Sequence, residues 1–285
     1  MLKTYKKYKK LKKYKPVTTQ KWFIVCIVCI VAGILGFYLF FVNNYFNIKN
    51  IKVSGVSTID PQNIKDIAQQ ILNSKQLLAS ASNIFTLPKN QIKKEVLGKF
   101  LNVKDVIINK QLPDQIEIII KERDEMALWC NQKPDENAYK GQGTSSPNNS
   151  NCFAIDENGI IFENKSATAP DFIINSQKDN TKPGDKVLGQ EELAVIKNIK
   201  EKTQSQAGIK IVVCDMLSPT QYNFKTENGW YLFFNPKKDI ELQTVSLNLV
   251  LKTKLPESKR GGLKYIDLRF ETIATYPEIP KESAK

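Results

Sequence analysis

One stretch near the amino terminus constrains the whole chain. Residues 22–42, WFIVCIVCIVAGILGFYLFFV, are 21 consecutive residues without a charged side chain. A helix rises about 1.5 Å per residue, so this stretch could cross the roughly 30 Å hydrocarbon core of a bilayer. It predicts a single transmembrane helix. About 240 residues follow it, enough for one large domain or two small ones.

The segment before this stretch, residues 1–21, carries nine lysines and no acidic residue. Lysine-rich flanks stay on the cytoplasmic side, so we expect a plasma-membrane protein with residues 43–285 outside the cytoplasm. A cleaved signal peptide does not fit, because the apolar run is too long and no small-x-small cleavage site follows it. Tyrosines and leucines recur at every third position among the lysines. Whether the segment also lies on anionic lipid or is only a topology signal stays open.

The composition argues against several functional classes. The formal charge of +13 falls to +4 once the nine lysines are set aside, so no nucleic-acid partner is expected. Histidine is absent, which excludes Ser-His-Asp triads, Cys-His pairs and imidazole-bound metals. Acidic residues cluster only at predicted turns, and no phosphate-binding glycine loop or S-x-x-K motif occurs. We expect a non-enzyme without a cofactor or a metal.

Residues 46–123 predict the element order β-α-α-β-β. A strand is expected at residues 48–56, and two strands at 103–110 and 115–122 surround a Leu-Pro-Asp turn. Asp60 and Pro61 are a typical start for the first helix, and Pro88 begins the second. Helical spacing assigns these side chains to the buried faces: Ile64, Ile67, Ala68, Ile71 and Leu72 in the first helix, and Ile92, Val96, Leu97 and Phe100 in the second.

Residues 124–276 predict a second, mainly antiparallel domain. Asn-Gly pairs at 158–159 and 228–229 predict two hairpins with type I′ turns. A helix is expected at 191–202 and a strand at 209–213. Residues 240–251 fit either a strand or a helix, and Asp239 as a helix N-cap favours the helix. The last element is expected to be one long strand at residues 263–275.

Two cysteines flank a polar segment, residues 131–151, that predicts a surface loop. Cys130 ends one predicted strand and Cys152 begins the next, so antiparallel pairing would bring their sulfur atoms together. A disulfide is chemically permitted outside the membrane, and two buried free thiols are the alternative. Cys214 is expected to be an unpaired core residue.

Four motifs follow one another along the chain: the V-x-G near the first strand, the N-I-F-x-L before the second helix, the run L-P-D-Q-I-E-I-I-I-K-E-R-D-E-M-A-L-W, and Tyr-Ile-Asp-Leu-Arg-Phe at 265–270. Together they resemble the bacterial cell-division family FtsQ/DivIB. The third departs from the family pattern at Glu125, where proline is usual. The resemblance implies an α+β fold: a transmembrane helix (22–42) after a cytoplasmic tail (1–21), a POTRA domain (46–123), an FtsQ-type β domain (124–276) and a tail (277–285).

The resemblance also implies a binding edge at the end of the β domain. In the family, this strand pairs with an extended segment of a partner. The implied site residues here are Tyr265, Asp267, Arg269, Phe270, Ile273, Thr275 and Tyr276. The alternative for Asp267 and Arg269 is purely structural, with the two side chains satisfying each other or a nearby loop.

The implied function is a division scaffold at the septum. Its partners would be FtsB/DivIC-like and FtsL-like bitopic proteins and other divisome components, and its role would be to help assemble and regulate septal peptidoglycan synthesis. The alternative functions are a membrane-anchored POTRA scaffold or chaperone unrelated to division and, with less support, an extracytoplasmic hydrolase.

Overall fold

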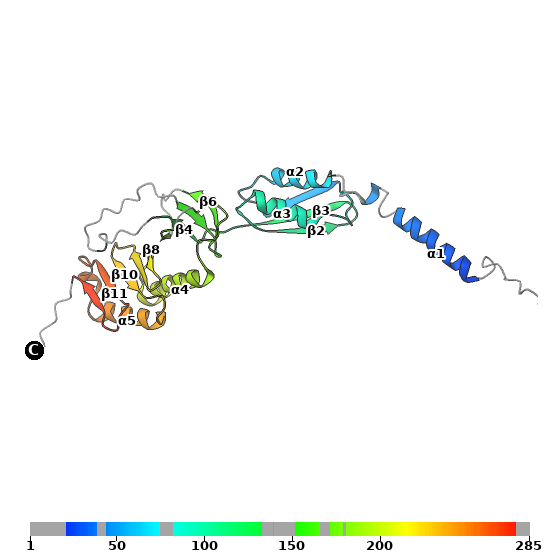
Figure 1. Cartoon of the computed structure of the whole chain (residues 1–285). Helices are drawn as coiled ribbons and strands as arrows, with labels where there is room; N and C mark the ends of the chain where they lie inside the picture. The colour runs from blue at the N-terminus through cyan, green and yellow to red at the C-terminus, as the bar shows by residue number, and fades with distance from the viewer. Residues whose placement is uncertain are drawn as a thin grey trace, which may run out of the picture. The chain divides into compact units, whose positions relative to one another are not determined.

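The computed structural model describes residues 21–38, 44–74, 82–132, 139, 152–165, 172–178 and 181–277 (Figure 1). Parts of several predictions lie outside the described residues. They are the lysine-rich tail before residue 21, the end of the apolar stretch at 39–42, most of the surface loop 131–151, and the tail after 277. The first helix, α1 (Lys21–Phe37), takes up the beginning of the apolar stretch. No helix within the described residues combines the length and apolar character needed to cross a membrane.

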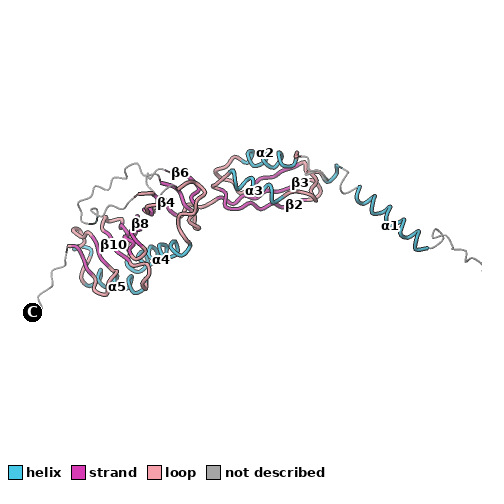
Figure 2. The backbone as a smooth tube through the Cα atoms, viewed as in Figure 1, coloured by secondary structure: helices cyan, strands magenta, loops and turns pink. Residues whose placement is uncertain are grey.

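The chain divides into two compact units, residues 1–96 with 105–120, and residues 97–104 with 121–285. After η3 (Asn44–Phe46), the first fold follows the predicted order β-α-α-β-β (Figure 2). Its elements are β1 (Asn50–Ser54), α2 (Pro61–Leu72), α3 (Lys89–Lys99), β2 (Val103–Gln111) and β3 (Gln115–Glu122). The sheet order is β1-β3-β2, with β1 parallel to β3. The predicted order is therefore confirmed.

Local sequence explains where these elements start and which faces they bury. The Asp60 side chain accepts a hydrogen bond of 2.9 Å from the Gln62 N–H and caps α2, as predicted. All five residues expected on the buried face of α2 are buried. In α3 only Ile92 and Val96 are buried, whereas Leu97 and Phe100 are half-buried, so the predicted face was too wide.

Gly55 follows β1 and turns the chain where the backbone of β3 comes close. Its φ of +79° lies in the left-handed region, and a Cβ atom built there would lie 2.2 Å from the Ile120 carbonyl oxygen. A side chain would therefore be strained by its backbone conformation and would also collide with β3. This contact gives a physical reason for the glycine of the V-x-G motif.

The second unit is built on a nine-stranded sheet in the order β12-β11-β10-β9-β8-β7-β4-β5-β6. Its strands are β4 (Ala127–Cys130), β5 (Cys152–Ile155), β6 (Ile161–Lys165), β7 (Ile173–Asn175), β8 (Ile211–Ser218), β9 (Gln221–Thr226), β10 (Tyr231–Phe234), β11 (Tyr265–Asp267) and β12 (Ala274–Tyr276). Five neighbouring pairs are antiparallel; β4 with β7, β7 with β8, and β10 with β11 are parallel. A mainly antiparallel sheet was expected. The sequence did not predict strand β7.

Two helices cover one face of this sheet. Helix α4 (Gln190–Ala207) contributes Leu193, Ile196 and Ile199 to the main core. Helix α5 (Ile240–Thr253) adds Leu247 and Leu251, and its N-cap Asp239 accepts a hydrogen bond from the Leu242 N–H at 3.2 Å. The choice of helix over strand at residues 240–251 is confirmed. A short 3₁₀ turn, η5 (Glu257–Lys259), follows.

The hairpins form at both predicted places, but their loops are longer than expected. In the second hairpin, the Gly229 N–H donates to the Thr226 carbonyl at 3.0 Å, and the Thr226 N–H donates to the Trp230 carbonyl at 2.9 Å. The same pattern joins Asp156, Gly159 and Ile160. This pattern closes a three-residue loop that ends in a glycine of positive φ, in place of a two-residue type I′ turn.

The expected long strand at residues 263–275 is wrong. The chain forms β11, turns over residues 268–273 and returns as β12, antiparallel to β11. The reason lies in Asp267, whose carboxylate accepts hydrogen bonds from the backbone N–H and the side chain of Arg269. An aspartate that binds the backbone two residues ahead favours a turn over a continued strand.

Arg123 and Asp156 form a nearly buried ion pair within the second unit, with side chains 15% and 2% exposed. Burial pushes the pKa of Asp156 upward, but the Ile160 N–H, the Arg123 guanidinium and the Asn158 N–H outweigh it, so this pKa lies below its ordinary value. The carboxylate thus stays ionised and orders the turn of the first hairpin.

We expect Gly55→Ala to destabilise the first unit by about 1 to 3 kcal/mol, because the new Cβ would meet the Ile120 carbonyl at a positive φ. Hydrogen exchange of the β1 and β3 amides should accelerate accordingly. The matched control is Gly98→Ala on the exposed side of α3, where nothing lies within 4 Å. That change should stabilise by about 0.5 to 1 kcal/mol. Equal exchange in the two variants would contradict the close-contact explanation.

Candidate functional site

The predicted site residues gather at one end of the nine-stranded sheet. Strand β12 is the terminal strand, and its only partner among the described strands is β11. Tyr265 lies opposite Tyr276, Ile266 opposite Thr275, and Asp267 opposite Ala274. The expected edge therefore exists, but a short strand pair forms it in place of one long strand.

The two edges of the sheet differ in the backbone partners that they have among the described residues. At the β6 edge, the Ile161 N–H donates to the Asp185 carbonyl at 2.9 Å, and the Ile161 carbonyl accepts from Gly184 at 2.8 Å. A loop thus covers the start of that edge. In the part of the chain that the structure describes, no segment pairs with the outer side of β12. Open edges with unpaired backbone groups can accept an added strand.

An aromatic row reaches this edge on the sheet face turned away from α4 and α5. Ile266 of β11 joins the core beneath the helices, so its neighbour Tyr265 points to the opposite face. The Tyr265 ring stacks on Phe233 at 4.7 Å and on Tyr276 at 5.8 Å between ring centroids. Tyr276 remains 48% exposed. The row therefore ends in a partly exposed ring at the edge of the sheet.

Arg269 holds the turn beside this row. Its Nε and Nη2 donate to the two oxygens of Asp267 at 2.9 and 2.6 Å, and Nη1 donates to Gln221. The guanidinium lies 5.5 Å from the centre of the Phe233 ring and 5.2 Å from that of Phe270. Asp267 raises the pKa of Arg269, which stays charged. The hydrogen bonds expected from the purely structural alternative for Asp267 and Arg269 are therefore present, because the two side chains bond to each other.

The seven predicted residues do not share one environment. Tyr265, Asp267 and Tyr276 lie on the aromatic face, Arg269 reaches over it from the turn, and Phe270 beside Arg269 is 60% exposed. Ile273 packs against the main core, and the half-buried Thr275 is paired with Ile266 on the core face. A charge at Ile273 would therefore disturb folding before it tested any binding.

Three residues of this site were not predicted from the sequence. Phe233 and Tyr231 lie in β10, whose alternation marks a strand but not which face meets the edge. Tyr139 lies in the polar loop, where no pattern singles it out; it is buried against Tyr231 at 4.7 Å and Phe233 at 5.5 Å.

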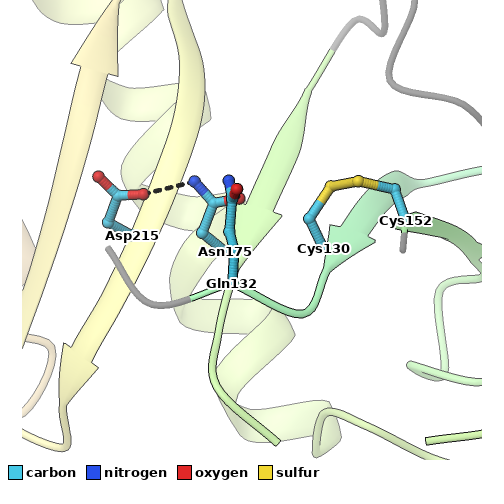
Figure 3. The surroundings of a disulfide bond; sticks show 5 residues. All are labelled: Cys130, Gln132, Cys152, Asn175 and Asp215. Carbon is cyan, nitrogen blue, oxygen red and sulfur yellow. Dashed lines mark hydrogen bonds between the residues drawn. A yellow bond between two sulfur atoms is a disulfide. The ribbon is translucent and has the colours of Figure 1, made fainter. Parts of the chain in front are cut away.

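Cys130 and Cys152 form a disulfide across the antiparallel pair β4 and β5 (Figure 3). Nearby, the buried carboxylate of Asp215 accepts hydrogen bonds from Asn175 at 2.6 Å and from the Tyr139 hydroxyl at 3.0 Å. Burial raises the pKa of Asp215. Gln132, two residues after Cys130, donates to Asn175 of β7 at 2.7 Å. Tyr139 contacts Asp215 of β8 and Tyr231 of β10, so both loop residues are held against the sheet.

The described residues contain no group of three or more Cys, Asp or Glu side chains that could hold a metal ion. Cys214 is a free and fully buried thiol whose pKa is raised by burial, as expected of a core residue.

Comparison with known proteins assigns the first fold. The FtsQ-type POTRA domain family matches residues 46–123, the span of the β-α-α-β-β fold. The chain is thus a POTRA-domain protein. A curated relative, the cell division protein DivIB of Clostridium botulinum (strain Hall), is 24% identical over 227 residues, which cover 76% of this chain and 78% of the relative. Both similarities support the FtsQ/DivIB family of bacterial cell-division proteins.

Replacing Cys130 and Cys152 together by serine should lower the free energy of unfolding by roughly 3 kcal/mol in the chain-entropy model for a loop of this length. Fluorescence of the buried Trp129 and Trp230 would report the transition. The matched control, Cys26→Ser with Cys29→Ser, changes two cysteines of α1 and should leave that transition unmoved. If alkylation mapping without reductant modified Cys130 in the wild-type protein, the bridge would not form in solution.

Proposed function

We propose that this chain is a non-catalytic, membrane-anchored scaffold of the division machinery. Its β12 edge would bind extended segments of FtsB/DivIC-like and FtsL-like bitopic partners. The observation that carries the proposal is the contrast between the two edges of the sheet: loop residues 184–186 cover the start of β6, whereas β12 has no such cover among the described residues. The division context is supported by the FtsQ-type POTRA match and by the similarity to DivIB.

Strand addition suits the geometry of this edge. A partner strand beside β12 would gain backbone hydrogen bonds, which supply affinity without depending on side chains. Selectivity would come from the exposed ring of Tyr276 and from Phe270, which lie where an added strand would place its alternate side chains. The Asp267–Arg269 pair would act as a support, because it fixes the turn that brings β12 back along β11.

We propose the membrane anchor from the sequence. Helix α1 holds the first part of an uncharged stretch that continues to residue 42, and all nine lysines of residues 1–21 come before that stretch. In this arrangement residues 1–21 stay cytoplasmic, 22–42 span the bilayer, the POTRA domain (46–123) and the β domain (124–276) lie outside, and residues 277–285 form a tail. Confining scaffold and partners to one membrane raises their effective concentration.

We expect Thr275→Pro to weaken co-purification of the DivIC-like chain of the same organism at least about tenfold, because proline in β12 removes a backbone donor and distorts the edge. The matched control is Asn164→Pro in β6, an exposed position of the opposite edge strand. It should leave co-purification intact. Tryptophan fluorescence must show that both variants fold. Undiminished capture by Thr275→Pro would refute the edge proposal.

A fluorescently tagged copy of the full chain should form a band at midcell in dividing cells. This experiment separates the division scaffold from the alternative, a POTRA-containing envelope scaffold or chaperone that is not specific to division. The alternative predicts an even signal around the envelope at every stage of the cell cycle, and such a signal would rule out the septal role.

A further inference from the structure

Three segments of the first unit meet at the end where its chain begins. Residues 44–49 lead into β1, residues 82–87 precede α3, and residues 111–114 join β2 to β3. The Ile84 N–H donates to the Phe46 carbonyl at 2.9 Å, the Ile48 N–H to Ser82 at 2.8 Å, and the Lys49 N–H to Asp114 at 2.8 Å. Backbone hydrogen bonds therefore fix the three segments to one another.

Large apolar side chains are exposed at this end. Leu112 is 65% exposed, Tyr45 60% and Phe85 41%. The Phe46 ring contacts both aromatic neighbours edge-on, with centroids 5.1 Å from Tyr45 and 5.1 Å from Phe85. Single exposed apolar residues are ordinary, but three on hydrogen-bonded neighbouring segments suggest an interaction surface. We call Tyr45, Phe85, Leu112, Lys49 and Lys110 the proximal surface.

Lysines surround these apolar side chains. Lys110 donates to the Phe85 carbonyl at 3.2 Å, and Lys89 donates to the Ile108 carbonyl at 2.7 Å. Lys49 is 62% exposed and lies 3.7 Å from Asp114, the acidic group of the β2–β3 turn. Partial burial and the nearby charge of Lys89 both lower the pKa of Lys110. Glu117 nearby is paired with Lys52 at 3.9 Å, so Lys49, Lys89 and Lys110 against Asp114 leave an excess of positive charge, which an anionic surface would relieve.

We propose that the proximal surface rests on the anionic lipid headgroups of the membrane that anchors the chain. The inference rests on the anchoring proposed above. Only residues 39–43 separate the described end of α1 from η3, and so short a link reaches at most about 20 Å. Wherever the apolar stretch leaves the bilayer, the proximal surface therefore stays within reach of the headgroups.

The chemistry of the surface matches that of a bilayer interface. Tyrosine rings are enriched at the level of the headgroups, where one end of the ring is apolar and the other is wet. Lysines beside them gain attraction from anionic lipids that decays within a Debye length. A leucine at the tip of a turn can enter the boundary between headgroups and acyl chains without disturbing the strands behind it.

The test uses the full chain in vesicles, with a polarity-sensitive fluorophore on Leu112→Cys and with the free cysteines Cys26 and Cys29 of α1 changed to alanine. The matched control carries the fluorophore on Leu101→Cys, an exposed leucine at the other end of β2. Nitroxide-bearing lipid should quench the Leu112→Cys label at least about twofold more than the control, because an interfacial segment sinks about 5–10 Å into the headgroup boundary. The difference should be larger in phosphatidylglycerol vesicles than in phosphatidylcholine vesicles. Lys49→Gln with Lys110→Gln should abolish that lipid preference.

Flotation and resistance to alkaline extraction report anchoring separately. If the chain floats but the two labels are quenched equally, the lipid contact is refuted while anchoring stands; this is also the outcome expected if a protein covers the proximal surface. Quenching that is the same in both lipids would refute the role of the lysines. If the chain does not float, both the anchoring and the lipid contact fail.

Discussion

Every open β-sheet has two edges whose backbone donors and acceptors need partners, and this constraint shapes the second unit. At the β6 edge, residues 184–186 supply the missing hydrogen bonds around Ile161. At the other edge the sheet ends in β12, three residues long and paired only with β11 within the described part. A short, open edge limits unwanted association yet leaves backbone groups for a chosen strand. The proposed binding by strand addition would complete a hydrogen-bond pattern that the described part of the fold leaves open at β12.

The Asp267–Arg269 pair shows how one local interaction serves that edge. Because the aspartate binds both the backbone and the guanidinium of Arg269, the chain reverses after β11 and brings Tyr276 beside Tyr265. The same guanidinium lies over Phe233 and so ties the turn to β10. The Asp-x-Arg part of the Tyr-Ile-Asp-Leu-Arg motif is thus explained in the first place by the turn that it stabilises between β11 and β12.

Features that depend on neighbouring residues could be predicted from the sequence, whereas features that depend on contacts between distant residues could not. Helix caps and periodicity located α2 and α5, since Asp60 and Asp239 act through neighbouring residues. The turn after Asp267 was missed because alternating apolar residues continue through it, and the hydrogen bonds of Arg269 override that pattern. Strand β7 is only three residues long, too short for a periodic signal. Phe233 and Tyr139 meet the predicted site through pairing over long sequence distances, which no local pattern contains.

The position of β12 in the topology has a consequence for biosynthesis. Among the described strands, β12 pairs with β11 alone, and β11 joins the rest in parallel with β10 after the chain has passed through α5. Parallel pairing of this kind closes a long loop, which is slow compared with local hairpins. Strand β12 is also the last described strand in chain order, so it is synthesised after the other described strands of the sheet. Chains truncated before β12 lack this edge, and recruitment through the strand, as proposed above, would exclude them from the division site.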